Sequence, residues 1–166
     1  MPSPLPPKET YTEAGKKRPD TPKLLAATIR AAVAAAGRSK LPLLVGGKSM
    51  GGRITSQCLA AAELPAARGA VFLGFPLHPA KHPATTRAAH LPEVALPMLF
   101  LQGTRDALAE PRLLRPLVRR LPSATLHEIA EADHSFAVPK RAGRDAEDVL
   151  EELADEIAAF ARRVIC

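Results

Sequence analysis

The sequence predicts an α/β fold in which helices cover both faces of a mostly parallel sheet. Short runs of continuously apolar residues alternate along the chain with longer segments whose apolar residues recur at helical spacing. Strands that are apolar at every position are typical of parallel sheets, because such sheets bury both of their faces. With 166 residues, the chain is long enough for one domain with a hydrophobic core and too short for two.

The first predicted elements are a helix, a strand, a helix and a strand. The segment Asp20-Thr21-Pro22 provides a cap and a first-turn proline for a helix over 22–36. The apolar run that follows predicts a buried strand over 41–46. An alanine-rich segment with one apolar face predicts a helix at about 50–62, and a further apolar run predicts a strand over 69–75.

The alternation continues after a long irregular segment over 76–92. A third buried strand is predicted over 97–103, and a helix begins near Pro111 and is interrupted by a second proline. A shorter and less buried strand is predicted over 124–129. The last helix, at about 145–164, has acidic residues in its first turn and two arginines in its last, as the helix dipole favours. Its predicted apolar stripe consists of Val149, Leu150, Leu153, Ile157, Phe160 and Val164.

The net charge of +6 is concentrated near the N-terminus, where residues 1–48 hold nine Lys and Arg against three acidic residues. We expect residues 1–20 to be an irregular, basic, proline-rich segment and residues 21–166 to form the domain. Without a basic helix or interleaved aromatic residues, nucleic-acid binding is not expected. The chain has no apolar run long enough to span a membrane, no signal-peptide pattern and no disulfide framework. These features indicate a cytoplasmic protein.

The segment between the first predicted strand and the following helix contains the pattern Gly-x-Ser-x-Gly at Gly47, Ser49 and Gly51. A serine on a sharp turn from strand to helix is the nucleophile elbow of α/β-hydrolases. The turn forces the serine backbone into a strained conformation, so the positions two before and two after it are expected to need glycine for steric reasons.

Three polar residues each follow a predicted strand, namely Ser49, Asp106 and His134. Because the carboxyl ends of parallel strands meet at one edge of a sheet, we expect these side chains to lie together. Their order along the chain is that of an α/β-hydrolase triad, with serine as nucleophile, histidine as base and aspartate as its partner. The N–H of Met50, at a helix N-terminus, would be one oxyanion donor. Asp133 is the rival acid, but side chains of adjacent residues rarely face each other.

Three histidines lie in the irregular segment, at positions 78, 82 and 90. Prolines prevent a helix from aligning them and no acidic residue lies nearby, so we expect neither a metal site nor a cofactor. His78 follows a strand and is a candidate pocket residue. Lys48 and Arg53 flank the elbow and are candidates for contact with an anionic substrate, although surface charge is the simpler interpretation.

The motifs G-G-K-S-M-G-G-R, F-L-G-F-P-L-H-P, L-Q-G-T-R-D and A-D-H-S-F resemble dienelactone-hydrolase-like members of the α/β-hydrolase superfamily. They are most similar to the branch that contains the hydrolase-like domain of NSL complex subunit 3 and its testis-expressed relative. The resemblance implies an α/β-hydrolase fold and triad roles for Ser49, Asp106 and His134. Dienelactone hydrolases use a cysteine nucleophile, so the serine here favours esterase-like chemistry.

The chain departs from this family pattern at its start. The initial strands and the His-Gly-type motif that the resemblance implies are absent from the sequence, and with them the second oxyanion donor. We therefore expect a serine hydrolase acting on a small-molecule ester or acyl substrate through Ser49. The alternative is a catalytically weak hydrolase-fold module that binds a protein partner or forms a homodimer through the exposed sheet edge.

Overall fold

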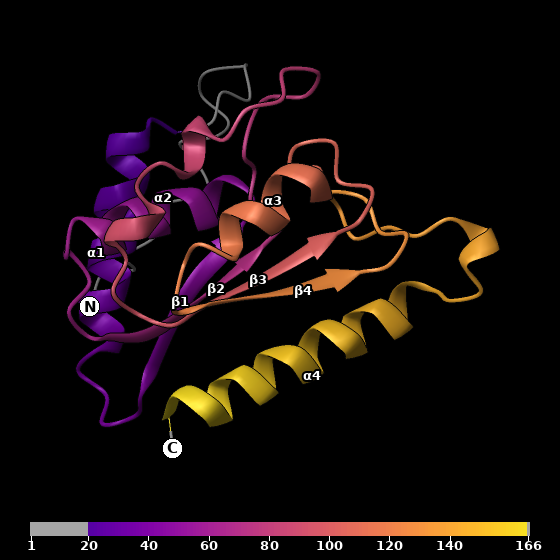
Figure 1. The fold of residues 1–166 in the computed structure, drawn as a ribbon. Coiled ribbons are helices and arrows are strands. Elements are labelled where there is room, and N and C mark those ends of the chain that lie inside the picture. Colours follow the sequence, from indigo (N-terminus) through magenta and orange to yellow (C-terminus); the bar gives the residue numbers. More distant parts are fainter. Residues whose placement is uncertain (1–19, 166) are drawn as a thin grey trace, which may run out of the picture.

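The computed structural model describes residues 20–165, which form helices on both faces of a four-stranded sheet (Figure 1). All neighbouring strands are parallel and follow the order β1-β2-β3-β4. The predicted fold class is confirmed. The strands are β1 (Leu43–Lys48), β2 (Ala67–Leu73), β3 (Met98–Gly103) and β4 (Ala124–Ile129). The helices are α1 (Pro22–Ala36), α2 (Met50–Ala60), α3 (Pro111–Val118) and α4 (Ala146–Ile165).

Helices α1, α2 and α3 lie on one side of the sheet and α4 lies alone on the other (Figure 1). The larger hydrophobic core is on the three-helix side. Phe72, Phe75 and Phe100 meet there with ring centroids 5.1 to 5.7 Å apart, and all three are fully buried. Three of the five phenylalanines of the chain thus meet at one place in this core.

The first strand differs from its predicted bounds, since it begins at Leu43 and reaches Lys48. Pro42 has no N–H to contribute to a ladder, and the preceding Leu41 is 77% exposed. The sheet pairing therefore starts later and runs up to the residue before the elbow.

The ends of α1 and α4 follow from their sequences. The Thr21 hydroxyl accepts a hydrogen bond from the Leu24 N–H (3.3 Å), which caps α1. In α4, acidic residues occupy the first turn and arginines the last, as expected. The predicted apolar stripe was wrong at one position: Leu150 lies at its edge and is 65% exposed, because Val149 on the adjacent face takes the buried position.

Two predictions about prolines and the long irregular segment are refined by the structure. Helix α3 continues through Pro116 and ends two residues later, at Val118. The segment over 76–92 is irregular for most of its length but contains the 3₁₀ turn η2 (Thr86–Ala88), and η3 (Leu91–Glu93) follows at its end.

The expectations for residues 1–19 lie outside the described residues. Within residues 20–165, no helix is both long and apolar enough to cross a bilayer.

Candidate active site

Ser49 occupies the junction between β1 and α2 in a backbone conformation that non-glycine residues rarely adopt, with φ of 51° and ψ of −120°. Two backbone hydrogen bonds hold it there. Its N–H donates to the Leu73 carbonyl at the end of β2 (2.9 Å), and its carbonyl accepts from the Arg53 N–H in α2 (3.1 Å). Neighbouring elements thus fix the strained turn that the sequence predicted.

Of the two glycines that the sequence predicted to be sterically required, the one before Ser49 is crowded and the one after it is not. A methyl group at Gly47, two residues before Ser49, would lie 2.9 Å from backbone atoms of Gly51 and Gly52, so this position is crowded. A methyl group at Gly51 would meet nothing within 4 Å. The crowded position in the helix is Gly52, where an added carbon would lie 2.6 Å from the Gly47 carbonyl oxygen. The steric demand after the serine therefore falls one residue later than expected.

His134 is brought next to Ser49 by the turn that follows β4. Its Nε2 lies 2.9 Å from the Ser49 Oγ, although 85 residues separate the two in sequence. Its Nδ1 lies 2.7 Å from the Asp106 Oδ2. Because a carboxylate only accepts, Nδ1 carries the proton in this arrangement and Nε2 is left to accept from the serine hydroxyl. Gly74 lies beside the imidazole, and its φ of 61° is a conformation that favours glycine.

Asp106 is only 1% exposed, and its carboxylate is held by three donors. One is His134; the second is the Leu108 N–H, which donates to Oδ1 (2.8 Å). The third is the Gln102 side-chain amide, which donates to Oδ2. These bonds orient a buried charge that would otherwise be costly.

Gln102 is a residue that the sequence analysis missed. It is buried in β3, and its Oε1 accepts from the Phe75 N–H (2.8 Å) while its amide nitrogen donates to Asp106. The side chain therefore links the end of β2 to the carboxylate. A single polar residue in an otherwise apolar strand, directly before the glycine of L-Q-G-T-R-D, was the available signal.

Asp133, the alternative acid in the sequence analysis, forms hydrogen bonds within its own turn. Asp133 Oδ1 accepts from the backbone N–H groups of Ser135 (2.7 Å) and Ala137 (3.0 Å), so it closes the turn that carries His134. The contact with the imidazole comes from Asp106.

The three remaining candidate residues differ in their surroundings. Lys48 ends β1 and is exposed, and Met50 is the first residue of α2, half-buried beside the serine. His78 is fully buried, with its Nε2 2.7 Å from a Glu110 carboxylate oxygen and its Nδ1 2.9 Å from the Pro79 carbonyl oxygen. With both nitrogens engaged, this histidine has no polar atom to present to a ligand, and it is better described as a link between the loop after β2 and α3.

The other histidines of the loop do not converge on His78. His90 contacts the buried Ser56 hydroxyl through Nε2 (2.7 Å), and His82 is exposed. Burial and, to a smaller extent, the Arg53 guanidinium lower the pKa of His90. Burial and then the neighbouring Arg87 lower the pKa of Arg53 itself. Across residues 20–165, no group of three or more histidine, cysteine or carboxylate side chains is arranged to hold a metal ion.

Comparisons with known proteins agree with this architecture. The alpha/beta hydrolase domain family matches residues 8–162. A dienelactone hydrolase from Anabaena variabilis superposes with a TM-score of 0.68 at 19% identity, over 95% of this chain and 67% of that one. An esterase domain of a Rhodothermus marinus protein gives 0.65 at 14% identity, over 94% of this chain and 73% of that one.

A third solved structure, an esterase from Thermogutta terrifontis, gives a TM-score of 0.63 at 15% identity and covers 89% of this chain and 74% of that one. At such identities the structural likeness shows the shared fold, whereas the family match spans nearly all of the sequence. The chain therefore belongs to the alpha/beta hydrolase domain family.

Proposed function

We propose that this protein is a serine hydrolase that cleaves carboxylic esters or related acyl compounds of small size. The observation that carries the proposal is the position of the His134 ring, 2.9 Å from the Ser49 hydroxyl and 2.7 Å from the buried Asp106 carboxylate. A serine hydroxyl is a poor nucleophile until an oriented base removes its proton. The esterases among the solved structures of the same fold support the choice of substrate class.

In the proposed reaction, Ser49 Oγ attacks the acyl carbonyl while its proton passes to His134 Nε2. The imidazolium then gives this proton to the leaving alkoxide, and an acyl-enzyme remains. Water attacks the acyl-enzyme with its proton taken by the same nitrogen, and the acid leaves as Ser49 recovers its proton. Asp106 holds the imidazole in the required tautomer and stabilises its cation throughout.

The tetrahedral intermediates need donors for their oxyanion. We assign one to the backbone N–H of Met50, because it lies at the start of α2, where N–H groups have no partner within the helix. Exposed Lys48, directly before the nucleophile, is our candidate for contact with an acidic group of the substrate.

The test is labelling with a fluorophosphonate probe, which reacts with an activated serine hydroxyl. Wild-type protein should be labelled, Ser49→Ala should not, and His134→Ala should be labelled far more slowly. Ser56→Ala is a matched control, because that serine is buried and should not contribute to labelling. Equal labelling of wild type and Ser49→Ala would refute the assignment of the nucleophile.

The alternative is a weak or inactive hydrolase-fold module that binds a protein, as the resemblance to the NSL complex subunit suggests. The outer edge of β1 favours it, because within residues 20–165 this strand pairs only with β2. A strand edge of this kind can accept another strand. Absence of labelling, together with recovery of a stable protein partner, would support the alternative; ester turnover lost in His134→Ala would contradict it.

A further inference from the structure

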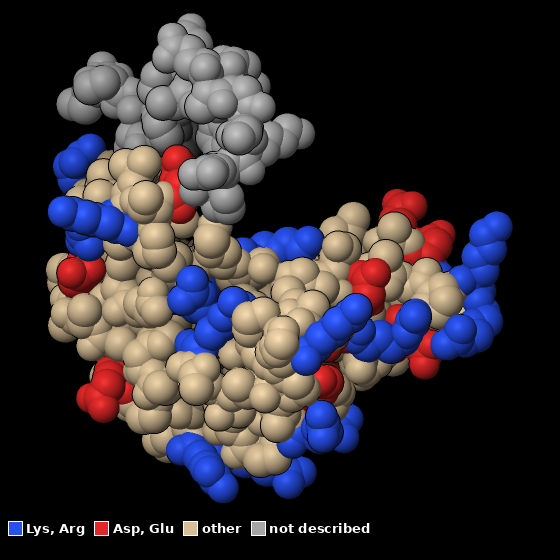
Figure 2. All heavy atoms as spheres, turned by 90° about the horizontal axis from the view of Figure 1, so that it is seen from above, with Lys and Arg blue, Asp and Glu red and all other residues tan. Residues whose placement is uncertain are grey.

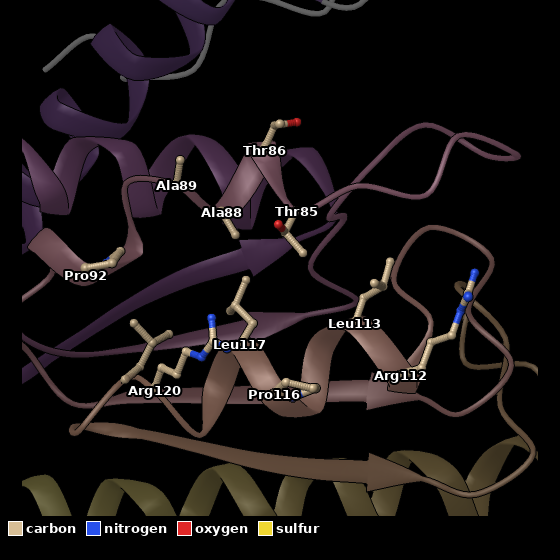
Figure 3. A pocket seen from close by; sticks show the side chains of 11 residues that line it. Thr85, Thr86, Ala88, Ala89, Pro92, Arg112, Leu113, Pro116, Leu117 and Arg120 are labelled. Atoms are coloured by element: carbon tan, nitrogen blue, oxygen red, sulfur yellow. The ribbon is translucent and has the colours of Figure 1, made fainter.

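A cavity of about 550 Å³ lies between α3 and the segment that carries η2 (Figure 3). We call it the α3 groove. Its apolar wall includes Ala88, Leu113, Leu117 and Leu121, and its rim includes Arg112 and Arg120. Ser49, Asp106 and His134 are not among the residues that line it. The groove is therefore separate from the candidate active site.

The walls of the groove are mainly apolar. Ala88 and Leu121 are buried. Leu113 and Leu117 extend from α3 towards η2 and remain half-exposed (Figure 3). The volume lies within the range of about 300–1,000 Å³ that is typical of small-molecule sites. A chain of methylene groups placed here would remove the two leucines from water, which favours binding by about 25 cal/mol for each Å² of apolar surface.

The charged residues of the groove are basic. Arg112 is 72% exposed, and its nearest carboxylate oxygen, in Glu110, is 3.9 Å away, while the other oxygen of that carboxylate is bonded to His78 at 2.7 Å. Arg120 forms no ion pair with any residue of the described part of the chain, and no acidic residue lines the groove. Seen from above, this side of the molecule also has basic side chains near its centre without acidic ones beside them (Figure 2).

We propose that the α3 groove binds a small amphiphile with an apolar chain and an anionic head group, such as a medium-chain carboxylate. The chain would lie against Leu113 and Leu117, and the head group would reach a guanidinium at the rim. Arg120 is the better partner, because Arg112 already has a carboxylate within 4 Å. Such a ligand makes two contacts at once, one with the leucines and one with a guanidinium. An inorganic anion would make only the second contact, and a neutral hydrocarbon only the first.

The experiment titrates the whole protein with decanoate below its micelle concentration and follows methyl resonances by NMR. Saturable shifts should appear at Leu113, Leu117 and Leu121. Decanol, which lacks the charge, and inorganic phosphate, which lacks the chain, should both bind more weakly. Shifts that map instead to the surroundings of Ser49, or no saturable shifts at millimolar decanoate, would overturn the proposal.

Three variants locate the two halves of the ligand. Thr85→Phe places a ring at an exposed position of the groove wall and should weaken decanoate binding at least tenfold. Arg120→Gln should weaken it about two- to fivefold, the range expected for an exposed ion pair. Arg119→Gln is the matched control, since this neighbouring arginine is exposed and does not line the groove.

Unchanged binding by folded Thr85→Phe would overturn the site, and equal effects of Arg119→Gln and Arg120→Gln would overturn the assigned head-group contact. Sedimentation provides a separate check. A wild-type dimer that Thr85→Phe dissociates would assign the groove to a second copy of the chain and overturn the proposal. None of these readouts depends on whether Ser49 is a nucleophile.

Discussion

Two adjacent glycines in the first turn of α2 allow the steric reasoning about the elbow to be tested directly. Gly51 belongs to the Gly-x-Ser-x-Gly pattern, whereas Gly52 does not. The structure reverses their expected importance, because a carbon added at Gly51 meets nothing within 4 Å and one added at Gly52 lies 2.6 Å from the Gly47 carbonyl oxygen. We therefore compare Gly51→Ala with Gly52→Ala.

Replacing glycine by alanine inside a helix stabilises the folded state by roughly 0.5–1 kcal/mol, and both positions share this gain. Only Gly52→Ala also adds a clash, with backbone on one side and the Phe72 ring at 3.3 Å on the other. Forcing an extra methyl group into a packed site costs about 1–3 kcal/mol. The free energy of unfolding should thus be about 1–3 kcal/mol lower for Gly52→Ala than for Gly51→Ala, which should equal or exceed wild type.

Urea unfolding, followed by circular dichroism, measures this difference. The displacement at Gly52 should also move Ser49, and a shift of about 1 Å in reacting groups can reduce the rate about 100-fold, so fluorophosphonate labelling should slow in Gly52→Ala. If Gly51→Ala were the less stable variant, the pattern glycine would have the structural role expected from sequence, and the reasoning from the contacts would be refuted.

Two further predictions concern side chains around the candidate site. Asp106→Asn should slow fluorophosphonate labelling by about 10³–10⁴-fold, because an amide favours the wrong imidazole tautomer. Asp133→Asn keeps its accepting oxygen and should be labelled at nearly the wild-type rate. If Asp133→Asn were instead the slower variant, Asp133 would be the acid. The pKa of His90 is lowered from its ordinary value of 6.5. As the pH falls below 6.5, the unfolded chain therefore takes up a proton that the folded chain resists. The contribution of His90 to stability is thus fully present above pH 6.5 and is lost as the pH falls. His90→Gln should therefore flatten the decline in the free energy of unfolding between about pH 7 and pH 5, measured by urea unfolding, while His82→Gln, at an exposed histidine, should leave it unchanged; equal curves for both variants would refute the role of burial.

Much of the candidate site follows from local patterns in the sequence. Each of Ser49, Asp106 and His134 comes after an apolar run, and parallel strands bring such positions to one edge of a sheet. Their proximity could therefore be anticipated, and the structure adds that β1 to β4 are neighbours in chain order. The preference for Asp106 over Asp133 also followed from sequence, since adjacent residues point in different directions.

Other features depend on contacts between segments that no local pattern reveals. Gln102 joins Phe75 to Asp106, and the importance of Gly52 depends on the approach of β1, so both become visible only when the strands are in place. His78 was a candidate for a pocket because it follows a strand, but its ring is buried against Glu110, a residue 32 positions later.

By itself, the sequence determined the fold class, the strained turn at Ser49 and the three residues that meet at the sheet edge, because apolar periodicity and chain order act locally and repeat along the chain. The tertiary structure alone decided which glycine is crowded, which polar side chain supports the carboxylate and where α3 leaves an apolar groove with basic ends. These depend on distances between segments far apart in sequence, and close packing sets such distances only once all the elements have come together.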